Sequence, residues 1–298
     1  MQAGEPSQTA KMTAVMRAHH YVSAPEPKIL HDNVALALSG AANETELMHH
    51  YQGVVELFTA LSDKETAELF VLRSAHAVCM RSRLFEEELR AALKEGAEQV
   101  IILGAGLDTT AYRYAQLLKD RPIYEIDHPA TQKWKKHTLE NAGISIPENL
   151  HFIGVDFETQ TLPDALAQAG IDRSRITVMS WLGVVMYLTD ESTIAGFKEL
   201  GSFAPGSRLV MDFLMPDYAQ SKEFEPDSLV HLNKVVSEMG EPMINQYTVE
   251  MLDERLKQAG FTQRRFFNSQ ELAALFMDGK RELFSMPDDT ITLLSATV

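Results

Sequence analysis

The sequence predicts an α/β protein with a seven-stranded, mostly parallel sheet, helices on both faces and a helical N-terminal region. From residue 98 onward, short apolar segments alternate with amphipathic segments of helical length, which is typical of parallel strands joined by helices. Residues 1–97 show helical periodicity and no convincing strand pattern. A glycine-containing turn at 104–106 joins the first predicted strand to a helix. We therefore divide the chain into a helical cap, 1–97, and an α/β domain, 98–298.

The helical cap is predicted from apolar residues that recur at intervals of three and four. This periodicity marks the ranges 8–20, 31–40, 44–60 and 63–75. Pro25 and Pro27 separate the first two helices, because proline lacks the N–H that a helix interior requires. The stretch from Ser74 to Glu95 forms a strongly amphipathic helix that leads to the first strand, and Gly96 ends it.

The α/β domain contains alternating strands and helices. Strands are predicted at 99–103, 122–127, 150–155, 175–181, 206–212, 261–267 and 289–297. Helices are predicted at 109–119, 129–141, 161–169, 190–202, 248–259 and 269–277. Residues 213–246 interrupt this alternation directly after the fifth strand and include three prolines. We interpret them as a lid-like insertion, because loops at strand ends commonly carry substrate-binding segments.

Composition excludes several classes of protein. The 298 residues, 45% apolar and 23% charged, describe a globular chain with no apolar run long enough for a membrane span. The formal net charge of −15 opposes binding to nucleic acid, whose phosphates are held by lysine and arginine. A small-molecule acceptor is the expected partner, with neither nucleic acid nor membrane. The single cysteine, Cys79, fits a cytoplasmic location. No histidine or cysteine spacing matches a metal site, so no metal is predicted.

The glycine turn is the most informative feature of the chain. Gly104 and Gly106 follow an apolar strand and precede a helix, so a ligand can approach the backbone without meeting a Cβ. Glu125 and Asp127 follow Gly104 by 21 and 23 residues, the distance at which an acid on the next strand meets a ribose. These signals predict a nucleoside-bearing cofactor. Thr109 replaces the third glycine of the dinucleotide fingerprint, which favours S-adenosylmethionine over NAD and disfavours an NAD-dependent oxidoreductase.

Further candidate residues lie where strands end or where the long helix approaches the sheet. Asp156 and Phe157 follow the third strand and suit an adenine, although a helix cap and a core phenylalanine explain them equally well. Arg81 could bind a cofactor carboxylate through its bidentate guanidinium. For Arg83 we favour an exposed pair with Glu86 or Glu87. Cys79 is interpreted as a buried, inert thiol.

Together these segments resemble the leucine carboxyl methyltransferase family, which includes phosphatase-modifying enzymes and tetracenomycin-type polyketide O-methyltransferases. The resemblance runs from about Thr9 to about Phe213 and rests on RSRLFEE (81–87), LGAGLDTTAYR (103–113), YEIDHPATQKWKK (124–136), VDFE (155–158) and GVVMYLT (183–189). It implies a Rossmann-like class I S-adenosylmethionine-dependent methyltransferase, to whose cofactor and substrate site the helical cap contributes.

By motif position, the resemblance also implies a set of cofactor-binding residues. Arg81 would hold the methionine carboxylate, Asp127 the ribose, and Asp156 with Phe157 the adenine. Gly104, Ala105 and Gly106 would line the methionine portion. Arg17 matches a basic position that closes over the cofactor. Leu182 departs from the family pattern, which carries a glutamate there to meet the cofactor's ammonium group. Thr110 stands where the bacterial polyketide branch usually has arginine.

We expect O-methylation of a carboxylate or hydroxyl on a small molecule such as a polyketide or another secondary metabolite. A carboxylate acceptor is ionised at neutral pH and needs no general base. For a hydroxyl acceptor the candidate bases, by placement, are Tyr187, His231 and Asp212. Leu182 motivates the alternative of a cofactor-binding protein, or an enzyme of the same fold, that carries out no ordinary methyl transfer.

Overall fold

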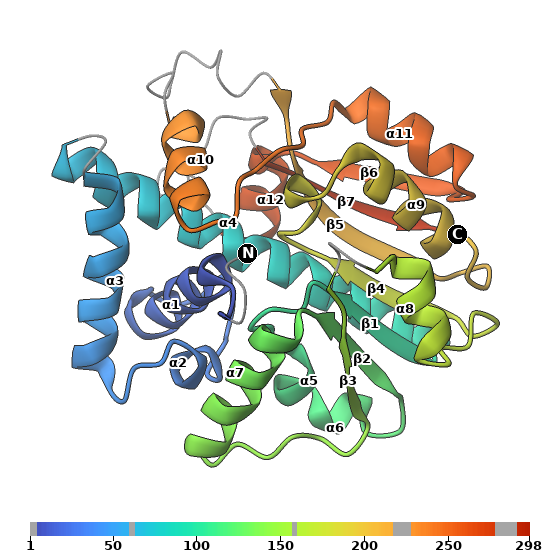
Figure 1. The fold of residues 1–298 in the computed structure, drawn as a ribbon, viewed down its shortest axis with the longest axis horizontal. Helices are drawn as coiled ribbons and strands as arrows, with labels where there is room; N and C mark the ends of the chain where they lie inside the picture. The colour runs from blue at the N-terminus through green and yellow to red at the C-terminus, as the bar shows by residue number, and fades with distance from the viewer. Residues whose placement is uncertain (1–4, 60–62, 157–159, 217–227, 278–290) are drawn as a thin grey trace.

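The computed structural model describes residues 5–59, 63–156, 160–216, 228–277 and 291–298 (Figure 1). Its centre is one sheet with the strand order β3-β2-β1-β4-β5-β7-β6. The strands are β1 (Gln99–Leu103), β2 (Ile123–Asp127), β3 (Leu150–Gly154), β4 (Thr177–Trp181), β5 (Arg208–Leu214), β6 (Gln263–Phe267) and β7 (Ile291–Thr297). The strands β1 to β5 are parallel, and β7 runs antiparallel to both of its neighbours. The predicted fold class is confirmed.

The strand order reverses between β1 and β4, and such a reversal is a common ligand-binding position in α/β sheets. From β1 the chain builds outward to β2 and β3, and then returns to place β4 on the other side of β1. The connections that leave β1 and β4 therefore diverge to opposite sides. In open α/β sheets, ligands bind at such a reversal, outside the carboxyl ends of the strands. The glycine turn after β1 and the loop after β4 both lie at this point.

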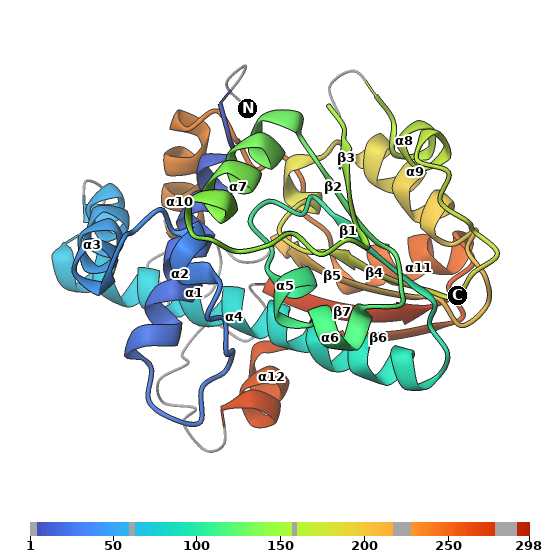
Figure 2. The ribbon, with the colours of Figure 1, turned by 90° about the horizontal axis from the view of Figure 1, so that it is seen from below.

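Each face of the sheet buries its own core, because successive side chains of a strand point to opposite faces. On one face Val100 and Ile102 pack with residues of α4 (Lys64–Lys94), α5 (Thr110–Arg113), α6 (Ala115–Leu118) and α12 (Ser269–Phe276). On the other, Ile101 and Leu103 pack with α8 (Leu162–Gln168), α9 (Asp190–Leu200) and α11 (Val249–Gln258). Figure 2 shows the first set of helices together on one side of the sheet. Helices cover both faces, as predicted.

The N-terminal region comprises α1 (Gln8–Ser23), α2 (Ala35–Leu38), α3 (Glu44–Thr59) and the start of α4. The helices predicted at 63–75 and 74–95 form the single helix α4, because no glycine or proline interrupts the sequence between them. α4 packs on α1 and α3 and also on β4, β5 and β7, so it belongs to the core of the sheet as well. The division at residue 97 stays a prediction.

The remaining helices are close to those predicted. The expected helix 109–119 is divided at Tyr114 into α5 and α6, where the Tyr114 hydroxyl is held by Glu86 and Arg90. α7 (Pro129–Asn141) begins at its proline. A short 3-10 helix, η1 (Val185–Tyr187), follows β4. The predicted insertion 213–246 contains an unforeseen helix, α10 (Ser228–Glu238). Within the described residues, no helix is long and apolar enough to cross a membrane.

Two alternatives on α4 are resolved. Arg83 pairs with Glu87, with 2.8 Å between Nε and Oε1, as favoured from the sequence. Cys79 is fully buried, and burial raises the pKa of its thiol. The thiolate is therefore disfavoured and the residue acts as part of the core.

Because His20 is buried, we expect the free energy of unfolding to depend on pH. Burial, together with the charges of His76 and Lys28, lowers the pKa of His20 to about 4, whereas an unfolded histidine titrates near 6.5. Below pH 6.5 the unfolded chain therefore binds a proton that the folded chain does not. The contribution of His20 is complete above pH 6.5 and is lost as the pH falls toward 4. Between pH 7.5 and 5 the loss is about 2 kcal/mol.

Denaturant unfolding at these two pH values measures the effect. The variant His20→Gln keeps an acceptor for the Leu30 N–H, which His20 Nε2 accepts at 3.4 Å, but has no titratable group. It should show a flatter pH dependence than the unaltered protein. Equal slopes for the two proteins would contradict the assignment to His20.

Candidate functional site

The glycine turn continues β1 alongside the end of β2. Its backbone has a positive φ of 59° at Gly104, a region that favours glycine. A Cβ at Gly104 would lie 2.2 Å from Cγ2 of Val184, in the loop after β4. The Ala105 N–H donates to the Ile126 carbonyl at 3.1 Å. The turn is thereby fixed between the ends of β2 and β4, at the reversal of strand order.

Asp127, at the tip of β2, holds this turn from the other side. Its carboxylate accepts the Gly106 N–H at 2.5 Å and the His128 N–H at 2.6 Å. The residue is half-buried, and burial raises the pKa of its carboxyl although these two hydrogen bonds act in the opposite direction. A carboxylate offers about four lone-pair positions, so two backbone donors leave acceptor capacity for the hydroxyls of a ribose.

Glu125, the other acid on β2, has a different role. It is fully buried and pairs with the equally buried Lys135 of α7, with 2.7 Å between Nζ and Oε2. Burial raises the pKa of Glu125 to about 7, despite the neighbouring ammonium group. Glu125 is thus committed to Lys135 inside the protein. Asp127, the last residue of β2, is the partly exposed member of the two acids that the sequence places at the ribose distance.

The end of β3 brings a third acid to the same edge. The Val155 N–H donates to the carbonyl of Asp127 at 2.9 Å, so Asp156 follows directly beside the tip of β2. Asp156 is half-buried, and its carbonyl accepts the Gln160 N–H at 2.8 Å. Phe157, the predicted adenine contact, lies outside the described residues.

Arg81 reaches the carboxyl ends of β4 and β5 from α4. Its Nη1 lies 2.9 Å from Oδ2 of Asp212, whose other oxygen accepts the Gly183 N–H at 2.5 Å. Gly183 has a φ of 69°, and a Cβ there would lie 2.8 Å from the guanidinium nitrogens. A glycine at this position allows Arg81 to cross the loop after β4. The Arg81 side chain is 19% exposed and that of Asp212 is fully buried, so the arginine is the solvent-accessible member of the pair.

The three candidate bases have different surroundings. Asp212 is neutralised by Arg81. Tyr187 in η1 has a hydrogen bond with Thr9, and burial raises the pKa of its phenol to about 12. The phenol is therefore protonated at neutral pH and is poorly suited to act as a base. His231 lies on α10, beside Leu232, which packs against the cluster formed by Met186 and Leu214.

Leu182, at the position where the family carries glutamate, is partly buried. It packs against the core on the α4 face of the sheet. It immediately precedes Gly183 and hence the point where Arg81 crosses the loop. An apolar residue thus precedes the glycine that Arg81 crosses, where the resemblance leads one to expect an acid.

Arg17, assigned from the resemblance to closing over the cofactor, lies against the glycine turn. Its Nη2 donates to the Leu107 carbonyl at 2.6 Å, and its Nη1 pairs with Asp32 at 2.7 Å. The side chain is 5% exposed. Its contacts are with the protein itself, so its effect on a ligand would pass through the turn.

Sequence reasoning missed Glu241, which follows α10 and binds the start of α1. Its carboxylate accepts the Gln8 N–H at 2.9 Å and the hydroxyls of Ser7 and Thr9. The Ser7 N–H donates to Thr131 of α7 at 3.1 Å. The first turn of α1 therefore lies between α7 and the predicted insertion, across the site. A contact between residues 232 positions apart leaves no local pattern in the sequence.

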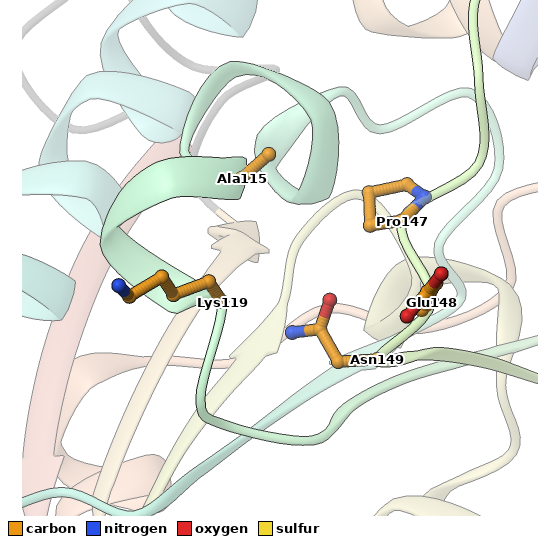
Figure 3. Close-up of a pocket in the computed structure, with 5 residues that line it drawn as sticks. All are labelled: Ala115, Lys119, Pro147, Glu148 and Asn149. Atoms are coloured by element: carbon orange, nitrogen blue, oxygen red, sulfur yellow. The ribbon is translucent and has the colours of Figure 1, made fainter.

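Figure 3 shows a separate hollow, which lies near the start of β3. Its lining residues are Ala115, Lys119, Pro147, Glu148 and Asn149. The Asn149 amide donates to the carbonyls of Leu118 and Arg121, so its donors are engaged by backbone. Because this hollow precedes β3, it lies at the amino ends of the strands, away from the glycine turn. Among the described residues, no cluster of histidines, cysteines and acids is arranged to hold a metal ion.

Comparison with known proteins assigns this arrangement to a family. A Bacillus subtilis protein, provisionally named S-adenosyl-L-methionine-dependent methyltransferase YktD, is 29% identical over 298 aligned positions, covering 96% of each chain. A Mycobacterium avium protein with a similar provisional name is 29% identical over 210 positions, 69% of this chain and 65% of the relative.

Solved structures agree in fold. A DUF574-family protein from Streptomyces avermitilis aligns with a TM-score of 0.56 at 14% identity, covering 98% of this chain and 97% of its own. A protein from Thermobifida fusca, provisionally named as a methyltransferase, gives 0.55 at 15% identity, with coverages of 99% and 96%. The family model for leucine carboxyl methyltransferase matches residues 10–200. The chain belongs to the leucine carboxyl methyltransferase family.

Proposed function

We propose that this S-adenosylmethionine-dependent methyltransferase converts a carboxylate of a small molecule into its methyl ester. The observation that carries the proposal is the state of two of the three candidate bases. Asp212 is paired with Arg81, and Tyr187 is held protonated. A carboxylate acceptor is already ionised at neutral pH and requires no base. The family model, named for methylation of a leucine carboxyl group, supports the same chemistry.

The residues at the strand ends suit the parts of the cofactor. Asp127 offers carboxylate lone pairs to the ribose hydroxyls, and Asp156 lies where an adenine amino group would need an acceptor. Arg81 presents a guanidinium for the methionine carboxylate. Gly104 and Gly106 contribute no side chain of their own to the turn. When bound, S-adenosylmethionine supplies an electrophilic methyl group on sulfur.

The chain itself would contribute positioning and exclusion of water. The first turn of α1, held by Glu241 and Thr131, lies across the site. Tyr187 of η1 is engaged with Thr9, which in turn donates to Glu241. Met186, Leu214 and Met243 form an apolar cluster beside Tyr187, which suits the apolar body of an acceptor. Holding the reacting groups in line accounts for most of the expected rate.

The test is a methyl-transfer assay with a panel of carboxylic acids and the matching alcohols and phenols. Formation of S-adenosylhomocysteine is followed, and each product is treated with alkali. A methyl ester releases methanol under alkali, whereas a methyl ether does not. Esters from the acids, with no loss of rate in His231→Gln, would support the proposal. Ethers from the hydroxyl compounds, with a rate that requires His231, would show hydroxyl methylation instead. Tight cofactor binding with no turnover on the whole panel would favour a protein without methyl transfer.

Leu182→Glu tests how the departure from the family pattern affects the site. The new carboxylate would lie next to Gly183, where Arg81 crosses the loop. We expect unchanged or tighter binding of S-adenosylmethionine, whose ammonium group gains a partner. We expect slower turnover of an anionic acceptor, because a second negative charge repels it. Calorimetry and initial rates on the same variant measure both, and Leu182→Gln controls for shape without charge. Weaker cofactor binding together with slower turnover, in a folded variant, would contradict this reading.

A further inference from the structure

A buried network of charges connects the N-terminal helices to the glycine turn. Asp32 lies three residues before the first residue of α2, and its side chain is 0% exposed. It accepts from Arg17 Nη1 at 2.7 Å, from Thr109 Oγ1 at 2.8 Å and from the Ala35 N–H at 3.0 Å. Arg113 Nε lies 3.4 Å from its other oxygen. Asp32 is in none of the motifs that point to the cofactor.

We propose that Asp32 and Thr109 are positioning residues, which fix the cofactor-binding turn through Arg17 and the start of α5. This inference rests on the proposed function, because it assigns to the glycine turn the binding of S-adenosylmethionine. It assigns no direct contact with the cofactor to either residue.

Thr109 is the link between Asp32 and the turn. Its hydroxyl donates to Asp32 and accepts from Arg113 Nε at 2.8 Å. Its carbonyl accepts the N–H groups of Tyr112 and Arg113 at 3.1 and 3.0 Å, so its position sets where α5 begins. Glycine, the residue of the dinucleotide fingerprint at this position, would provide no hydroxyl. Thr109, whose presence in place of the third fingerprint glycine disfavours NAD, therefore also has a structural function.

Arg17 holds the other side of the turn. One guanidinium nitrogen binds the Leu107 carbonyl and another binds Asp32. Leu107 and Thr109 are thus both fixed to the same carboxylate, one through Arg17 and one directly. The backbone between them, at Asp108, is held at both ends. A turn fixed in this way loses little conformational entropy when a ligand binds.

The network is electrically balanced. Arg113 also pairs with Glu86, whose second oxygen accepts the Tyr114 hydroxyl at 2.7 Å. Two arginines and two acids, each with a side chain at most 7% exposed, therefore neutralise one another. Buried ion pairs contribute little net stability compared with apolar residues of the same size. The charged network does, however, hold the backbone of the turn through directional hydrogen bonds, which apolar side chains could not form.

The experiment compares four full-length variants for binding of S-adenosylhomocysteine by calorimetry, with Tm measured on each. Thr109→Val keeps the shape and removes the hydroxyl, and Thr109→Ser restores a hydroxyl. Arg208→Gln is the matched control, since Arg208 pairs with Glu88 and Glu95 at the amino end of β5. We expect Thr109→Val to bind about tenfold more weakly and Thr109→Ser within about threefold of the unaltered protein. Arg208→Gln should lower Tm without a loss of affinity.

A split between kinetic constants separates positioning from general stability. In Thr109→Val the KM for S-adenosylmethionine should rise, with kcat largely unchanged. Asp32→Asn should shift binding in the same direction and further, because it also removes a buried charge. Wild-type affinity in Thr109→Val, or an equal loss in Arg208→Gln, would overturn the inference. Failure of the unaltered protein to bind S-adenosylhomocysteine would instead overturn the proposed function.

Discussion

Replacing Asp127 with asparagine is expected to weaken the binding of S-adenosylhomocysteine by about a hundredfold. A hydrogen bond to a charged group contributes about 1.5–3 kcal/mol, and two ribose hydroxyls would lose such a partner. The change also disturbs the protein itself. Asp127 accepts the N–H groups of Gly106 and His128 on its two oxygens. An amide has one acceptor oxygen, so its NH₂ would face one of these donors and shift the glycine turn.

Calorimetry with S-adenosylhomocysteine measures the loss. Asp253→Asn is the matched control, because Asp253 of α11 forms a partly exposed ion pair with Arg264 of β6; this variant should bind normally. Asp156→Asn should lose less affinity than Asp127→Asn, together with some discrimination between adenosine and inosine analogues of the cofactor. Unchanged binding in Asp127→Asn would mean that the ribose lies elsewhere.

The largest expected effect on stability comes from Arg81→Gln. It leaves the buried carboxylate of Asp212 without its cationic partner. Removing one member of a buried ion pair typically costs about 3–5 kcal/mol. Because Arg81 is partly exposed, we expect about 3 kcal/mol, at the lower end of that range. Denaturant unfolding measures the change in the free energy of unfolding, and cofactor affinity should fall in the same variant.

A second variant separates the two functions of Arg81. In Arg81→Gln/Asp212→Asn the unpartnered charge is absent, and an amide oxygen remains for the Gly183 N–H. Stability should recover for the most part, whereas cofactor affinity should stay low because the methionine carboxylate still lacks its guanidinium. Recovery of both would show that Arg81 only neutralises Asp212. Recovery of neither would show that the geometry of the loop after β4 requires the arginine itself.

The local patterns of the sequence were sufficient for the framework of the site. The alternation of apolar strands and amphipathic helices predicted all seven strands to within about two residues at the described ends, because burial on both faces leaves a strong signal. The glycines of the turn and Asp127 were predicted because their requirements are local: a positive φ, and an acid at the tip of the next strand. The same applies to Arg83, whose partner lies one helical turn away.

The contacts that complete the site are long-range and left no such signal. Arg81 and Asp212 are 131 positions apart, and Thr9 and Glu241 are 232 apart. The family resemblance assigned Arg17 to the cofactor, but the carboxylate that orients it, Asp32, lies between His31 and Asn33 in no recognisable motif. Glu125 and Asp127 both lie at the spacing from Gly104 that suits a ribose contact. Only the structure shows that Glu125 is fully buried and Asp127 is not. A side chain's partner depends on the tertiary packing, which one-dimensional periodicity does not report.

The antiparallel strand β7 has a consequence for the order of events during synthesis. In the described sheet, β6 pairs with β7 alone, and β7 lies between β6 and β5. On a ribosome, β6 emerges before the strand that joins it to the sheet. Until β7 inserts, β5 presents an edge of free backbone groups, and such edges are prone to pair with other chains. Assembly of the parallel strands that carry the glycine turn can therefore precede closure of this edge, which awaits the last strand.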